Sequence, residues 1–112
     1  MNEKTITKVS DGEFNEKVID PGRPAVVDFW ATWCQPCRRL DEIIGDVAGR
    51  YDGRVSFYKV DVNENAATAS RFAVRSIPML LFFNGGEVVD QVVGAMSREE
   101  IERKLERLLE PA

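Results

Sequence analysis

The sequence predicts an α/β domain with a mixed central sheet covered by helices on both faces, and three observations support this. Buried-strand patterns alternate with amphipathic stretches of helical period, as where the apolar run 25–31 precedes the periodic stretch 40–51. Two strand-like runs, 77–83 and 87–93, flank the turn sequence Asn84-Gly85-Gly86, which indicates a hairpin. The length of 112 residues fits one domain that spans the whole chain.

The first half of the chain predicts two strands and two helices. Residues 5–9 form a short strand, and Ser10 with Glu13 is a capping box for a helix that ends at Pro21. The run 25–31 is almost wholly apolar, as in a strand buried on both faces. The next helix carries an apolar stripe at helical spacing, formed by Leu40, Ile43, Ile44, Val47, Ala48 and Tyr51.

The second half adds three strands and two helices. Residues 54–62 predict a strand, after which Asn63 is expected to cap a helix that runs to Phe72. The hairpin follows, and a second capping box of Ser97 and Glu100 begins the last helix. The order βαβαβα, then ββα, predicts parallel pairing first and an antiparallel part after it.

Composition narrows the possible functions. Nineteen acidic against fifteen basic residues give a net charge of −4, which argues against nucleic acid or an anionic membrane as partner. The chain has no histidine, so it has no histidine base and no histidine metal ligand. No apolar run reaches the roughly 20 residues of a transmembrane helix, and the polar start MNEKTITKVSDGE lacks the apolar region of a signal peptide. We therefore expect a cytoplasmic protein, and a monomer.

The only two cysteines, Cys34 and Cys37, stand where the 25–31 strand gives way to the following helix. A thiol at a helix N-terminus has a lowered pKa, because the helix dipole and the free amides stabilise the thiolate. Pro36 has no amide hydrogen, so the donor available to a Cys34 sulfur at the N-cap is the amide of Cys37. The pattern predicts a redox pair in which Cys34 attacks a substrate disulfide and Cys37 resolves the mixed disulfide.

Other uses of a Cys-x-x-Cys pair fit this chain less well. A structural zinc site needs four ligands, and here it would require a second copy of the chain or carboxylate ligands. Haem attachment needs a histidine after the second cysteine, where this chain has Arg38. A purely structural disulfide would close a very small loop and restrict little chain entropy. We therefore expect no bound metal or cofactor, with the redox-active disulfide Cys34–Cys37 carrying the electrons.

Asp28 is the only ionisable residue between Ala25 and Trp33. An acid in a strand covered on both sides is costly unless it has a function, and burial would raise its pKa. The alternative is a solvent-facing acid or a structural acid whose hydrogen bonds are satisfied. For Lys59, an outward-facing strand lysine is an equally open alternative to a functional role.

Four segments together resemble the thioredoxin family. VVDFWATWCQPC, FYKVDVNEN, SIPMLLFFNGGEVV and VVGAMS follow in the family's order, and the resemblance covers about residues 5–110. It implies a five-stranded mixed sheet of order 1-3-2-4-5 flanked by four helices. It also implies a protein dithiol–disulfide oxidoreductase that thioredoxin reductase recharges. Its clients would be proteins such as ribonucleotide reductase, peroxiredoxin or methionine sulfoxide reductase.

The resemblance also implies a role for each matching residue. Cys34 would be the nucleophile and Cys37 the resolving thiol. Asp28 would be the buried carboxylate that helps to deprotonate Cys37, and Lys59 the lysine near that acid. A substrate-binding surface around the reactive sulfur, with the proline in a cis peptide bond, would comprise Trp33, Gln35, Pro36, Ile77, Pro78, Gly94 and Ala95.

Three positions depart from the family pattern. Gln35 stands where glycine is usual, and residues between the cysteines tune the reduction potential, so a disulfide oxidant or isomerase of the same fold is an alternative. Glu42 replaces a helix-kinking proline, which predicts a straighter helix. Met79 replaces a threonine and predicts a slightly more apolar docking surface. A scaffold or partner subunit with an incidental redox pair is a further alternative.

Overall fold

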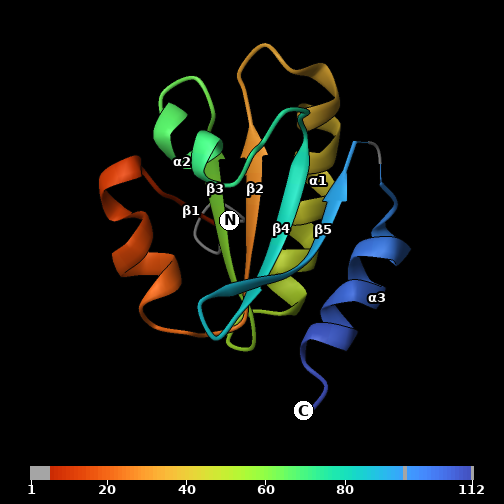
Figure 1. Cartoon of the computed structure of the whole chain (residues 1–112). Helices are drawn as coiled ribbons and strands as arrows, with labels where there is room; N and C mark the ends of the chain where they lie inside the picture. The colour runs from red at the N-terminus through yellow and green to blue at the C-terminus, as the bar shows by residue number, and fades with distance from the viewer. Residues whose placement is uncertain (1–5, 95, 112) are drawn as a thin grey trace.

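A five-stranded sheet lies between two layers of helices in the computed structural model, which describes residues 6–94 and 96–111 (Figure 1). The strand order is β1-β3-β2-β4-β5. The first three strands in this order pair in parallel, and the last two join antiparallel. This confirms the predicted sheet. The strands are β1 (Ile6–Lys8), β2 (Ala25–Trp30), β3 (Ser56–Asp61), β4 (Met79–Asn84) and β5 (Glu87–Val93).

Helical segments cover both faces of the sheet. The N-terminal helical segment and α2 lie on one side, and α1 and α3 lie on the other (Figure 1). This agrees with the predicted four flanking helices, because η2 and η3 together form the first of them. The segments are η2 (Asp11–Glu13), η3 (Asn15–Ile19), α1 (Gln35–Arg50), α2 (Ala66–Arg71) and α3 (Arg98–Leu108).

The first helical segment, which the sequence predicts as a helix, is not a regular α-helix. It consists of a 3₁₀ turn followed by a π-helical turn. The Glu13 carboxylate accepts hydrogen bonds from the amide and the hydroxyl of Ser10, both at 3.1 Å, so the predicted pairing of these two residues is present. A segment this short has little helical stability of its own, so the burial of Phe14 and Val18 against the sheet determines its geometry.

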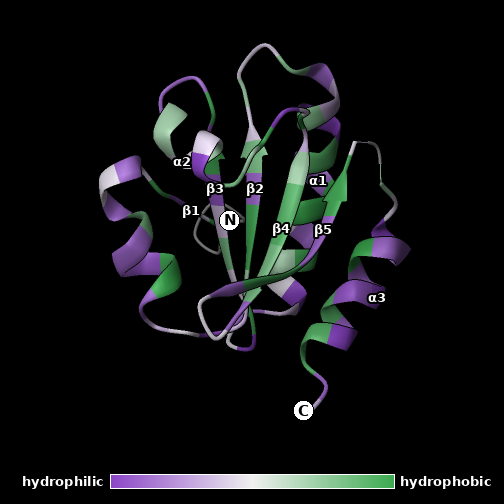
Figure 2. Ribbon diagram, in the orientation of Figure 1, coloured by the Kyte–Doolittle hydropathy of each residue, from purple (hydrophilic) through white to green (hydrophobic). Residues whose placement is uncertain are grey.

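Each face of the sheet buries its own apolar core. On one face, Val26 packs with the apolar sides of α1 and α3. On the other face, Val27 and Phe29 pack with Phe14 and Val18 from the N-terminal helical segment. Apart from Asp28 and the terminal Asn84, the central strands β2 and β4 are therefore apolar on both faces, while the helices keep hydrophilic outer surfaces (Figure 2). This arrangement holds β2, and the cysteine pair that follows it, between two packed layers.

The cap of α2 is not the predicted one. Asn63 is exposed and precedes the helix by a turn. The carboxylate of Asp11 caps the helix instead, since it accepts from the Thr68 amide at 2.8 Å and the Ala67 amide at 3.3 Å. Asn65 completes the contact, because its side-chain oxygen accepts from the Asp11 amide at 2.9 Å. A partner distant in the chain thus replaces the local cap.

Four predicted strands are shorter than expected. β1 ends at Lys8, one residue before the predicted end, and Thr5 lies outside the residues that the structure describes. β2 ends at Trp30, one residue early, and β3 omits two residues at its start and one at its end. β4 begins at Met79, so Ile77 and Pro78 belong to the loop before it. Proline has no amide hydrogen for the ladder, which explains the later start of β4.

Replacing Asp11 with alanine should lower the urea midpoint of unfolding, because the free amides at the start of α2 lose their acceptor. Asn63→Ala is the matched control, since the exposed Asn63 side chain does not cap the helix. Equilibrium urea unfolding followed by far-UV circular dichroism measures both midpoints. Equal midpoints for the two variants would show that Asp11 does not act as the cap.

Candidate active site

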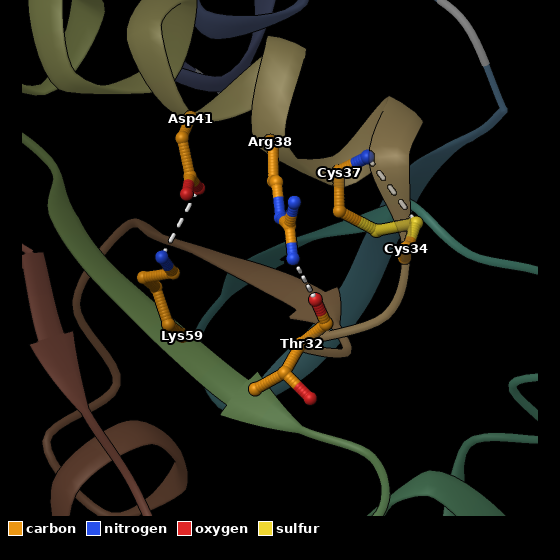
Figure 3. Close-up of a disulfide and its surroundings, with 6 residues drawn as sticks. All are labelled: Thr32, Cys34, Cys37, Arg38, Asp41 and Lys59. Carbon is orange, nitrogen blue, oxygen red and sulfur yellow. Dashed lines mark hydrogen bonds and ion pairs between the residues drawn. A yellow bond between two sulfur atoms is a disulfide. The ribbon is translucent and has the colours of Figure 1, made fainter.

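The cysteine pair lies at the junction of β2 and α1. Cys34 is the N-cap of α1, and its extended backbone turns the chain from the strand into the helix. The amide of Cys37 donates a hydrogen bond to the Cys34 Sγ at 3.2 Å (Figure 3). Pro36 occupies the first turn between them. The structure therefore contains the N-cap hydrogen bond that the sequence predicts.

The two cysteines form a disulfide with a Cα–Cα separation of 5.3 Å. Both are buried, and they share a small apolar cluster with Ala31. Val62 and Ile77 pack against this cluster from two other parts of the chain. The sulfurs thus lie in an apolar environment beyond the carboxyl end of the central strand β2, where water solvates a charged sulfur poorly.

The loop before β4 and the end of β5 meet beside the cysteines. The Ile77–Pro78 peptide bond is cis, as the family resemblance implies. The carbonyl of Pro78 accepts a hydrogen bond from the Gly94 amide at 2.8 Å. Gly94 has a positive φ of 82°, a conformation that glycine adopts without strain. This bond joins three predicted surface residues into one unit next to the disulfide.

Three further predicted surface residues are neighbours of the cysteines in the chain. Trp33 is 67% exposed and is the most exposed large apolar side chain among the described residues. Gln35 and Pro36 are exposed in the first turn of α1. Ala95 lies outside the residues that the structure describes. An exposed tryptophan beside a buried disulfide is suited to contact with an apolar partner surface.

Asp28 is buried in the middle of β2, with 1% of its surface exposed. It shares a strand face with Val26, which packs against α1, so its carboxyl lies on the α1 side of the sheet. Neither carboxyl oxygen accepts a hydrogen bond within the described part of the chain. Burial raises the pKa of Asp28 to about 7, partly offset by Lys59 and reinforced by Asp41. A carboxyl in this range is suited to proton transfer near neutral pH.

Lys59 lies directly opposite Asp28 in the β2–β3 register. Its side chain is only 17% exposed, so it is not a solvated outward lysine. Its Nζ lies 3.0 Å from the Asp41 Oδ1 (Figure 3). The same Nζ lies 4.5 Å from the centre of the Trp30 ring. The lysine thus lies near the buried acid, as the resemblance implies, but forms its ion pair with a different carboxylate.

Sequence reasoning missed two residues that shape this site. The Arg38 guanidinium donates to the Thr32 carbonyl at 2.7 Å, which ties α1 to the loop before Cys34 (Figure 3). Sequence reasoning also missed Asp41, the partner of Lys59. Its position four residues after Cys37 was the available signal, because residues at this spacing share a helix face.

The described ranges 6–94 and 96–111 hold neither a metal site nor a membrane-spanning helix. No cluster of three or more acidic, cysteine or histidine side chains in these ranges could hold a metal ion. No helix in them has the length and apolar character needed to cross a membrane.

Comparison with known proteins gives consistent matches. The thioredoxin family model matches residues 5–107. Thioredoxin of Synechocystis is 43% identical over 91% of this chain and 95% of its own length. Thioredoxin of Staphylococcus haemolyticus is 43% identical over 93% of this chain and 98% of its own length. Chloroplastic thioredoxin M4 of Arabidopsis thaliana is 39% identical over 93% of this chain, which spans about half of that protein, 54%.

Replacing Asp28 with asparagine should stabilise the oxidised protein at pH 8 and much less at pH 4. The folded-state pKa of Asp28 is raised from 3.8 to about 7, so the folded state binds a proton that the unfolded state releases. Parent stability therefore falls as pH rises from about 4 to about 7, by roughly 1.4 kcal/mol per unit. The expected advantage of Asp28→Asn at pH 8 is up to roughly 4 kcal/mol.

Urea unfolding across this pH range measures the effect. Asp46→Asn, on the exposed side of α1, is the control for loss of one carboxylate. If the stability curves of Asp28→Asn and the parent run parallel, Asp28 does not have a raised pKa.

Proposed function

This chain belongs to the thioredoxin family of disulfide oxidoreductases, and we propose that it reduces disulfide bonds in client proteins. The observation that carries this proposal is the hydrogen bond from the Cys37 amide to the Cys34 sulfur. In the reduced protein this donor and the N-terminus of α1 favour the Cys34 thiolate over the thiol. A stabilised thiolate is the attacking species in thiol–disulfide exchange.

The reaction proceeds by two exchanges of sulfur partners. The Cys34 thiolate attacks one sulfur of the client disulfide, which forms a mixed disulfide and releases the other client sulfur as a thiolate. The Cys37 thiol then loses its proton, for which Asp28 is the proposed acceptor, and attacks the Cys34 sulfur. This forms the Cys34–Cys37 disulfide and releases the second client thiolate. Two electrons have then passed from the cysteine pair to the client.

The client would dock on the surface around the cysteine pair. The exposed Trp33 ring, the half-buried Ile77 and the backbone at Gly94 lie around the disulfide and support this role. Ala95 belongs to the same predicted surface. Ribonucleotide reductase, peroxiredoxin and methionine sulfoxide reductase are candidate clients, and thioredoxin reductase is the proposed source of electrons. We propose a monomer acting in the cytoplasm, where a dithiol is kept reduced.

Two alternatives remain within this fold. A disulfide oxidant or isomerase is left open by Gln35 between the cysteines, since this position tunes the potential. A scaffold role would make the cysteine pair incidental. The near-neutral pKa that burial gives Asp28 supports the reductase, because that role needs a proton acceptor for Cys37.

Replacing Cys37 with serine should trap the client on the protein, because Cys34 still attacks but nothing resolves the mixed disulfide. With insulin as substrate, non-reducing mass spectrometry should show an adduct at Cys34 and turnover should fall to background. The control Cys34→Ser should form no adduct at comparable rate. Rapid adduct formation through Cys37 in that control would reverse the assigned roles.

The reduction potential of the pair should identify the direction of the reaction. We expect a value near about −270 mV, the known value for thioredoxin. Equilibration with defined thiol–disulfide buffers, followed by tryptophan fluorescence, measures it. A value between about −180 and −120 mV would place the protein with the isomerases and oxidants instead.

A further inference from the structure

Asp41 carries a partly exposed carboxylate on α1, close to the cysteine pair in the chain. It lies on α1 four residues after Cys37, so it shares a helix face with the buried resolving cysteine. Its side chain remains 42% exposed. Together with Lys59, Trp30 and Lys8, it lines a groove of about 700 Å³ that runs between α1 and β1. Asp41 thus faces both the solvent and the charged groups beneath α1.

Lys59 has two possible carboxylate partners but is bonded to one of them. Asp28 lies directly across from it on the neighbouring strand, on the same face of the sheet. The Lys59 ammonium instead lies in the groove, where it pairs with Asp41 at 3.0 Å and lies over the Trp30 ring. The Asp28 oxygens accept no hydrogen bond from any described residue. Asp41 therefore competes with Asp28 for the Lys59 ammonium.

Among the described residues packed around Asp28, the competition between Asp41 and Asp28 for Lys59 is the main charge interaction. On β4 its register partner is the apolar Leu80. On α1 the charged group that acts on Asp28 is Asp41, and on β3 the facing charge is Lys59. Lys8 on β1 lines the outer part of the same groove. Within the described residues, the charges that act on Asp28 are those of Lys59, which lowers its pKa, and Asp41, which raises it.

We propose that Asp41 is a positioning residue for the resolving step, because it holds the Lys59 ammonium away from Asp28 and so keeps Asp28 able to accept the Cys37 proton. The effect of Asp41 on the resolving step rests on the proposed function. The arrangement of Asp41, Lys59 and Asp28 does not depend on that function. Without Asp41, the lysine would be free to pair with the buried acid across the strands. A cation paired with Asp28 would favour its ionised form and weaken it as a base.

The Asp28 titration tests this arrangement directly. Carboxyl ¹³C NMR of the oxidised protein follows Asp28 without interference from thiol titration, and Asp28→Asn identifies its signal. Asp41→Ala should lower the midpoint by roughly one pH unit, because an unscreened opposite charge then acts on the acid. Asp41→Glu should restore most of the shift. Asp46→Ala is the matched control, since it removes one α1 carboxylate that pairs with Arg98 instead.

Repeating the Asp41→Ala substitution in a Lys59→Met protein separates two effects on the pKa of Asp28. One is the effect that acts through Lys59, and the other is direct repulsion between the two acids. In Lys59→Met the cation is absent, so Asp41→Ala should shift the midpoint less than it does in the parent. An equal shift in both backgrounds would overturn the proposed holding of Lys59. An unchanged midpoint in Asp41→Ala alone would overturn the proposal as a whole, whatever the activity of the protein.

The pH profile of resolution links the arrangement to the chemistry. Single-turnover decay of a preformed mixed disulfide should show its midpoint moving to lower pH in Asp41→Ala, by the same amount as the Asp28 titration. A shifted titration with an unshifted profile would overturn the role of Asp41 in resolution. If the parent forms no mixed disulfide at all, the proposed function fails, and the titration still decides whether Asp41 holds Lys59.

Discussion

The start of α1 at Cys34 is the constraint on which the site depends. One backbone amide, that of Cys37, donates to the sulfur at the N-cap, while the strand before it fixes where that cap lies. The three-residue separation brings the second sulfur within bonding distance of the first. The same few atoms therefore set the reactivity of one cysteine and the position of the other. A shift of the helix start by one residue would separate these two effects.

Burial of Asp28 is unfavourable for folding, and other interactions in the fold must offset it. Asp28 lies in a strand whose neighbours on both faces are tightly packed, and it has no hydrogen-bond partner among the described residues. Two apolar cores and ladders on both sides of β2 offset this cost. Above neutral pH the unfavourable charge acts against folding. A position optimised for stability alone would not carry this residue, which supports a role in proton transfer.

Sequence patterns predicted the parts of the fold that depend on local periodicity. The stripe from Leu40 to Tyr51 and the apolar run before it are strong enough to place the cysteines at a strand–helix junction. The cap of α2 could not be predicted in this way, because Asp11 reaches it from more than fifty residues away. The ion pair of Asp41 with Lys59 could not be predicted in this way either, because it joins a helix to a strand, although the spacing from Cys37 indicates the helix face on which Asp41 lies. The cis state of Ile77–Pro78 came from family resemblance alone, since no local pattern encodes it.

The central position of β2 has a consequence for how freely the site can move. Hydrogen bonds tie this strand to β3 on one side and to β4 on the other, so neither of its edges is open. Local opening of a protein starts where few contacts must break, and amide hydrogen exchange is slowest in elements like this one. The sulfurs are thus separated by only a short loop from a strand whose amides are expected to exchange slowly. A partner protein would therefore have to fit its own disulfide to cysteines whose position is held by the strand before them. For the same reason, we expect oxidation or reduction of the pair to cause little movement of the backbone of β2.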